Sequence, residues 1–196
     1  MSGRLTPFRD VLTGAVVTGA LASVLLAAPA SATPPGVPGK TVAQAELDTL
    51  TVPPEGSMSG YSRSLFPHWV TISGSCDTRE TVLKRDGTGV AVDGSCHPTS
   101  GSWYSPYDGA TWISPSNVDI DHIVPLAEVW RSGASGWTTS KRRDFANDLS
   151  DPELIAVTGT LNRAKGDQDP STWQPPRTPT GARTPRCGSA ASTSGR

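Results

Sequence analysis

The sequence predicts an α+β protein with one domain between two terminal extensions. Residues 71–113 consist of short apolar segments separated by Gly, Asp and Ser, a pattern typical of strands and turns. In residues 118–166, strand-like segments alternate with helix-like segments. The full chain of 196 residues has room for one domain of ordinary size.

The N-terminal segment predicts export. Arg4 and Arg9 precede a long apolar run that ends in the small-residue pattern Ala30-Ser31-Ala32. These features are typical of a secretory signal peptide spanning residues 1–32. A transmembrane anchor is the alternative, but Pro29 and the Ala, Gly and Thr content favour cleavage. We therefore expect a secreted protein without stable membrane association.

Residues 33–57 are predicted as a Pro-rich lead-in followed by a short helix. The lead-in is "TPPGVPGK", and the apolar residues of "TVAQAELDTLTV" have helical spacing until Pro53 ends the helix. Residues 61–69 then carry a compact aromatic patch, which we expect to form part of the core.

The cysteines predict one disulfide bond. Disulfides persist outside the cell, and a bond between Cys76 and Cys96 closes a loop of about 20 residues, worth about 3 kcal/mol. His97 follows Cys96, but no C-x-x-C or H-x-x-x-H partner completes a metal site there. Cys187 is left without a partner.

The second half of the domain has a definite order of predicted elements. A strand ends in Asp121-His122, and two helices follow. The first ends at Gly133, and the second begins after a cap at Thr138, Thr139 or Ser140. Residues 154–158 form the next strand by their β-branched content. A short helix after it carries Asn162 and stops near Gly166.

Three stretches in this region carry a family resemblance: "DIDHIVPLAEVWRSGA", "RRDFANDL" and "NRAKGDQDPSTWQPP". With them the chain resembles the HNH endonucleases, whose core is a ββα-metal (His-Me finger) fold. More closely, it is similar to a secreted bacterial branch related to the C-terminal domain of GmrSD-type restriction endonucleases. The resemblance covers residues 58–176 and implies a metal-dependent endonuclease domain there.

The resemblance implies a catalytic set of Asp121, His122, Asn147 and Asn162. A neutral imidazole is the natural base near pH 7, so His122 would take a proton from water. Asp121 and the amide of Asn162 offer hard oxygens, which suit Mg²⁺ or Mn²⁺ and leave positions for water and phosphate. Asn147 would tie the connection to the first strand through side-chain hydrogen bonds.

Strand geometry limits this arrangement. Adjacent residues of a regular strand point to opposite faces, so Asp121 and His122 face one ion only if the strand ends or bends there. Pro125 favours such an ending because it cannot continue a ladder of hydrogen bonds. Asp119 is expected on the face of Asp121.

Charge limits the mode of nucleic-acid binding. With 17 Lys and Arg against 18 Asp and Glu, the formal net charge of −1 excludes a strongly basic coat. Phosphate contacts are therefore assigned to two local clusters. The first is Arg163 and Lys165. The second is Arg142 and Arg143, which follow Lys141 in one basic run, and a solvated helix face is the alternative for this run. The expected substrate is DNA, with RNA as a further one, and the chain is expected to be a monomer.

The tail departs from the resemblance. Residues 177–196 have no apolar periodicity and are predicted to be disordered, whereas similar proteins continue with apolar helical segments. A truncated or frameshifted reading frame would explain this. Two alternatives to an active nuclease follow: a catalytically silent secreted module that binds nucleic acid or protein, and an inactive truncated nuclease. A serine hydrolase is excluded because no G-x-S-x-G turn is present.

Overall fold

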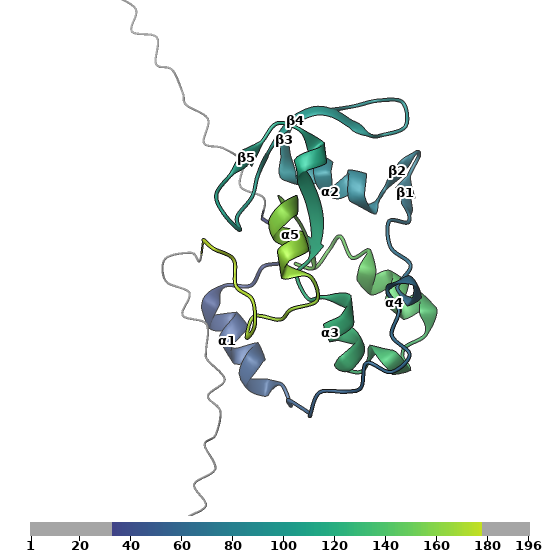
Figure 1. The fold of residues 1–196 in the computed structure, drawn as a ribbon, viewed down its shortest axis with the longest axis vertical. Helices are drawn as coiled ribbons and strands as arrows, with labels where there is room; N and C mark the ends of the chain where they lie inside the picture. The colour runs from purple at the N-terminus through teal and green to yellow at the C-terminus, as the bar shows by residue number, and fades with distance from the viewer. Residues whose placement is uncertain (1–32, 178–196) are drawn as a thin grey trace, which may run out of the picture.

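The computed structural model describes residues 33–177. The predicted signal peptide, Cys187 and all but the first residue of the predicted tail lie outside the described residues. The helices are α1 (Lys40–Thr49), α2 (Thr78–Asp86), α3 (Leu126–Arg131), α4 (Thr139–Ala146) and α5 (Gly159–Lys165), and the 3-10 turns are η1 (Arg63–Leu65), η2 (Pro115–Asn117) and η3 (Ala134–Gly136). Figure 1 shows α5 in the middle of the molecule, between the strands of the upper part and α3 in the lower part.

The strands form three small antiparallel sheets, which together with the helices agree with the predicted α+β class. Their bounds are β1 (Thr71–Ser73), β2 (Cys76–Asp77), β3 (Gly87–Val92), β4 (Pro98–Tyr104), β5 (Thr111–Trp112), β6 (Val118–His122) and β7 (Leu154–Thr158). Strands β1 and β2 pair with each other, β4 lies between β3 and β5, and β6 pairs with β7.

The β6–β7 pair and α5 make a strand–strand–helix unit. The register places Val118 opposite Thr158 and His122 opposite Leu154, so both strands are paired along their whole length. Helices α3 and α4 are inserted between the two strands, and α5 follows β7 without a loop and packs on both strands. This order agrees with the elements predicted for residues 118–166.

The prediction of strands and turns throughout residues 71–113 was wrong for α2. The Asp77 carboxylate accepts a hydrogen bond from the Glu80 N–H at 2.9 Å, and the Glu80 carboxylate accepts one from the Asp77 N–H at 3.0 Å. This reciprocal capping box satisfies two N–H groups that a helix start otherwise leaves unpaired. Local capping therefore outweighs the β-branched content of the segment.

One apolar cluster holds the β6–β7 pair against α2 and β4. Ile120 and Leu154 of the pair belong to one buried cluster with Leu83 of α2 and Trp103 of β4, and Trp103 is 1% exposed. The indole N–H of Trp103 donates to the Leu83 carbonyl at 2.8 Å, so this large side chain is buried without an unsatisfied polar group.

A second apolar cluster forms around the helical insertion. It joins the segment around η1 to α3 and α4 and contains Phe66, Leu126, Val129, Trp130, Ala134 and Ala146. Phe66 is fully buried, which contributes about 1.5–3 kcal/mol. The predicted core role of the aromatic patch therefore holds for Phe66, while Tyr61 and Trp69 are only partly buried.

Three further local predictions can be compared with the structure. Cys76 and Cys96 form the predicted disulfide bond. Helix α4 begins after Thr138, whose hydroxyl accepts from the Lys141 N–H at 3.2 Å. Helix α1 is present as predicted, but none of its residues is buried.

Candidate active site

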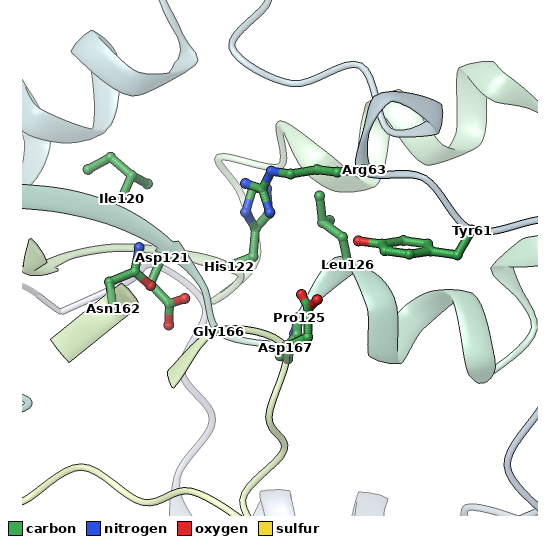
Figure 2. Close-up of a pocket in the computed structure, with 10 residues that line it drawn as sticks. All are labelled: Tyr61, Arg63, Ile120, Asp121, His122, Pro125, Leu126, Asn162, Gly166 and Asp167. Carbon is green, nitrogen blue, oxygen red and sulfur yellow. The ribbon is translucent and has the colours of Figure 1, made fainter. Parts of the chain in front are cut away.

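Asp121 and His122 point to opposite faces of β6. Asp121 faces α5, together with Asp119, while His122 faces the segment that precedes β1 and the end of α4. Strand β6 ends at His122, so a cavity of about 330 Å³ reaches both side chains around the strand end (Figure 2). The cavity is lined by Tyr61, Arg63, Ile120, Asp121, His122, Pro125, Leu126, Asn162, Gly166 and Asp167.

The His122 imidazole is buried, neutral and fixed in orientation. It is 4% exposed, and its Nε2 lies 3.0 Å from the Ala146 carbonyl oxygen. A carbonyl can only accept a hydrogen bond, so Nε2 carries the proton and Nδ1 keeps a free lone pair. Burial lowers the pKa of His122 to about 3, with a smaller contribution from the cation of Arg63.

Two aromatic rings complete the surroundings of His122. The Trp69 ring lies 5.6 Å from the His122 ring, and the His68 ring lies 6.3 Å from it on a nearly perpendicular plane. Trp69 has a left-handed backbone with φ of +58°, which is uncommon for a bulky side chain. Such strain costs about 1–3 kcal/mol and clusters at functional sites, so the surrounding fold must hold Trp69 in place.

The Asp121 carboxylate lies under α5 in a network of hydrogen bonds. The Lys165 ammonium donates to both carboxylate oxygens at 2.8 and 2.7 Å, and the Tyr107 hydroxyl donates to one of them at 2.5 Å. Asp121 is 4% exposed and Lys165 is 5% exposed. Burial raises the pKa of Asp121, and the Lys165 ammonium opposes that rise.

Asp121 and Asn162 fit a divalent ion by their donor chemistry. An ionised carboxylate has about four acceptor positions, and three are occupied by Lys165 and Tyr107. The Asn162 side chain lines the same cavity and makes no hydrogen bond within residues 33–177. One carboxylate position and one amide oxygen, beside an open cavity, suit Mg²⁺ or Mn²⁺ with additional water ligands.

Asn147 supports the site from outside the cavity. Its amide oxygen accepts from Val70 N–H at 3.2 Å and from the Thr78 hydroxyl at 2.7 Å, while its amide nitrogen donates to the carbonyls of Pro67 and Arg143 at 2.8 and 2.7 Å. The prediction that the Asn147 side chain bonds to the strand carrying Asp121 and His122 was wrong, because none of its four hydrogen bonds reaches β6. The link between this segment and β6 is made instead by the neighbouring Ala146 carbonyl, which accepts a hydrogen bond from His122.

Two of the residues assigned to phosphate do not fit that assignment. Arg142 is 8% exposed, and its guanidinium donates to the carbonyls of Leu65, Ala134 and Trp137. Lys165 is buried in its ion pair with Asp121. Both cations already satisfy oxygen atoms of the protein, so reaching a phosphate would leave those atoms unpaired in the interior.

The other two assigned residues remain on the surface. Arg143 pairs with Asp144 at 2.7 Å on the exposed side of α4. Arg163 pairs with Asp119 at 2.8 Å next to the face of Asp121, with 64% of its side chain exposed. Neither Arg143 nor Arg163 lines the cavity.

Sequence reasoning missed a buried acid beside the site. Glu153 precedes β7, is 6% exposed and accepts a hydrogen bond from the Val124 N–H at 3.4 Å. Its other carboxyl oxygen has no hydrogen-bond partner within the described residues. Burial raises the pKa of Glu153 to about 8, and the nearby charge of Asp121 adds to the rise. The run "SDPEL" contains no signal that distinguishes this acid from a solvated one.

A separate group of three carboxylates lies away from the cavity. Glu55, Glu128 and Asp169 have oxygen atoms within 4.8 Å of one another. Arg131 forms ion pairs with Glu55, at 3.4 Å, and with Glu128, so much of the negative charge of the group is compensated. This group therefore differs from the open pair of Asp121 and Asn162.

The chain has a close relative of similar length among known proteins. A protein of Arthroderma benhamiae (strain ATCC MYA-4681 / CBS 112371) named "Uncharacterized secreted protein" is 64% identical over 156 residues, which cover 79% of this chain and 76% of that protein. The chain belongs to the family of this secreted protein. Its predicted secretion is thereby confirmed, whereas the bacterial origin stays a prediction because the relative is fungal.

The family comparison also bears on function. Residues 96–182 match the family described as GmrSD restriction endonucleases, C-terminal domain, in agreement with the resemblance seen in the sequence. The match indicates a nuclease-related domain, and it includes Asp121, His122, Asn147 and Asn162. No solved structure matches the chain. Within residues 33–177, the helices are too short or too polar to traverse a bilayer.

Proposed function

We propose that this protein is a secreted, metal-dependent endonuclease that hydrolyses phosphodiester bonds of DNA and, as a further substrate, RNA. The observation that carries the proposal is the state of His122. Its Nε2–H donates to the Ala146 carbonyl, which leaves the Nδ1 lone pair free. The ring lines one cavity with Asp121 and Asn162. A general base of phosphodiester hydrolysis needs this neutral and oriented imidazole.

His122 takes the proton from the attacking water at Nδ1 in this proposal. The resulting imidazolium keeps its Nε2–H bond to Ala146, so the ring does not turn during the reaction. In the unliganded protein the imidazole is a weak base, because burial, with a smaller contribution from nearby cations, lowers its pKa to about 3. A phosphate group in the cavity brings negative charge next to the ring and raises its pKa, so substrate binding strengthens the base.

Asp121 and Asn162 are the residues that would hold Mg²⁺ or Mn²⁺. Such an ion supplies positive charge to the phosphate and to the leaving oxygen. Lys165 and Tyr107 orient the Asp121 carboxylate from the α5 side, and Asn147 holds the segment that ends at Ala146. The nuclease family match supports the assignment of nucleic acid as the substrate.

A catalytically silent binding module is the second candidate. The observation that favours it is the buried ion pair between Lys165 and Asp121, because an ammonium group already compensates the carboxylate. A silent module would bind nucleic acid without cleaving it, with or without a divalent ion.

Metal dependence separates the two candidates. The test is nicking of supercoiled plasmid by the oxidised chain from Thr33 onward, with Mg²⁺ or Mn²⁺ and with EDTA. We expect nicking only with a divalent ion, and a large loss in Asn162→Ala. Asn117→Ala, an exposed asparagine in η2, is the matched control and should keep full activity. If the folded protein does not nick the plasmid with either ion, the proposal that it is a nuclease is refuted.

A further inference from the structure

The cavity contains an arginine that has no partner in the protein. Arg63 lines the cavity, and Figure 2 shows its side chain extending from η1 toward the His122 ring. Its guanidinium makes no hydrogen bond or ion pair within residues 33–177. Every other arginine of that range donates to a carboxylate, a carbonyl or a hydroxyl group. Arg63 is thus free to bind a ligand.

The η1 turn that carries Arg63 is anchored to the rest of the domain by hydrogen bonds and by packing of its neighbours. The Phe66 N–H donates to the Arg63 carbonyl at 3.1 Å, and the Phe66 ring is fully buried. The buried Arg142 guanidinium donates to the Leu65 carbonyl at 2.9 Å. Tyr61, before the turn, packs its ring edge-on against Trp130 at 5.9 Å. These anchors fix the backbone of η1, so Arg63 projects from a preorganised position.

The charges around the cavity leave Arg63 as the unbalanced cation. Lys165 is compensated by Asp121, and Arg163 by Asp119. Arg63 lines the same cavity as Asp121 and His122, the two side chains on either side of the strand end. The Asp167 carboxylate lies on another part of the wall and repels anions, so an entering phosphate is directed toward Arg63 (Figure 2).

We propose that Arg63 binds the backbone phosphate of a nucleic acid that enters this cavity. The planar guanidinium can donate two parallel hydrogen bonds to two phosphate oxygens, which a lysine cannot do. The contact places the phosphate next to the His122 ring, and in this respect the inference rests on the proposed nuclease function. Arg63 lies outside the segment that matches the GmrSD family, so the N-terminal part of the domain supplies this contact.

Binding is measured first, under conditions that prevent cleavage. The wild type, Arg63→Ala and Arg63→Lys are titrated with a short DNA duplex in EDTA at several salt concentrations. Lys84→Ala is the matched control, because Lys84 is an exposed cation on α2 away from the cavity. We expect about 10-fold weaker binding for Arg63→Ala and an intermediate loss for Arg63→Lys. The slope of log affinity against log salt should fall by about one in Arg63→Ala.

Cleavage is measured second, with the same proteins and a divalent ion. Arg63→Ala should lose activity, and added guanidinium ion should restore part of it, because the ion can occupy the space of the missing side chain. A merely structural role would show no such rescue.

The outcomes separate the two proposals. Binding that depends on Arg63 in a wild type that never cleaves would refute the nuclease and leave the Arg63 contact standing. Cleavage by the wild type together with an Arg63→Ala variant that matches Lys84→Ala in affinity, salt slope and turnover would overturn the Arg63 contact alone. A wild type that does not bind DNA would overturn both.

Discussion

Replacing Glu153 by glutamine should stabilise the fold at alkaline pH and leave it nearly unchanged at acid pH. The Glu153 carboxyl is 6% exposed, and one of its oxygens accepts the Val124 N–H. Glutamine keeps that acceptor and is close in shape to the protonated acid. The substitution therefore removes the ionisation of Glu153 while preserving its packing.

The size of the effect follows from the pKa of Glu153. This pKa is about 8 in the folded chain, against 4.5 for an unperturbed glutamate. The folded state holds the proton more tightly than the unfolded state, so the carboxyl stabilises the fold below pH 4.5. That contribution is lost as the pH rises through about 8. Between pH 5 and 7.5 the wild type should lose about 3 kcal/mol relative to Glu153→Gln, at 1.36 kcal/mol per pKa unit.

The assay is urea unfolding followed by tryptophan fluorescence at pH 5, 6, 7.5 and 8.5. The difference in unfolding free energy between Glu153→Gln and wild type should grow steadily with pH. Glu46→Gln on the exposed helix α1 is the matched control and should follow the wild-type curve. A Glu153→Gln curve that stays parallel to the wild type over this range would refute the account of a buried, protonated Glu153.

Three further predictions concern stability. Asn147→Ala removes four hydrogen bonds and should lower the unfolding free energy by about 2–4 kcal/mol, measured by urea titration. An unchanged urea midpoint would contradict a structural role of the Asn147 side chain. Arg142→Lys should destabilise the fold by about 2 kcal/mol, because an ammonium cannot reach three carbonyls, whereas Arg143→Ala should change it by less than about 0.5 kcal/mol. Equal thermal shifts in these two variants would contradict the structural role of Arg142. The double variant Cys76→Ser/Cys96→Ser should lose about 3 kcal/mol, and a calorimetric loss close to zero would show that the disulfide bond does not restrain the unfolded chain.

The sequence was sufficient for features whose signals are local. The start of α4, the stop of α5 near Gly166 and the disulfide bond each depend on a few neighbouring residues and the redox setting. The opposite directions of Asp121 and His122 follow from the two-residue period of a strand. The capping box of α2 is a local signal of the same kind, present in "CDTRE", and the prediction of strands and turns for residues 71–113 missed it.

The partners of charged side chains could not be predicted. Arg142 and Arg143 are adjacent in the sequence, yet one is buried among carbonyls and the other is exposed. Which neighbour turns inward depends on where η1 and η3 pack against α4, because these segments supply the carbonyls that bind Arg142. Likewise, Arg63 reaches the cavity only because Phe66 and Arg142 fix a turn far upstream of the catalytic motif. Such contacts are set by tertiary packing and leave no periodic pattern.

Plasmid nicking by His122→Ala tests the central claim most directly. The variant is compared with the wild type and with His97→Ala, which replaces an exposed histidine outside the cavity, under the same divalent ion and with folding checked by circular dichroism. The account predicts a loss of about 10²- to 10⁴-fold for His122→Ala and wild-type activity for His97→Ala. Metal-dependent nicking by a folded His122→Ala protein at the wild-type rate would contradict it.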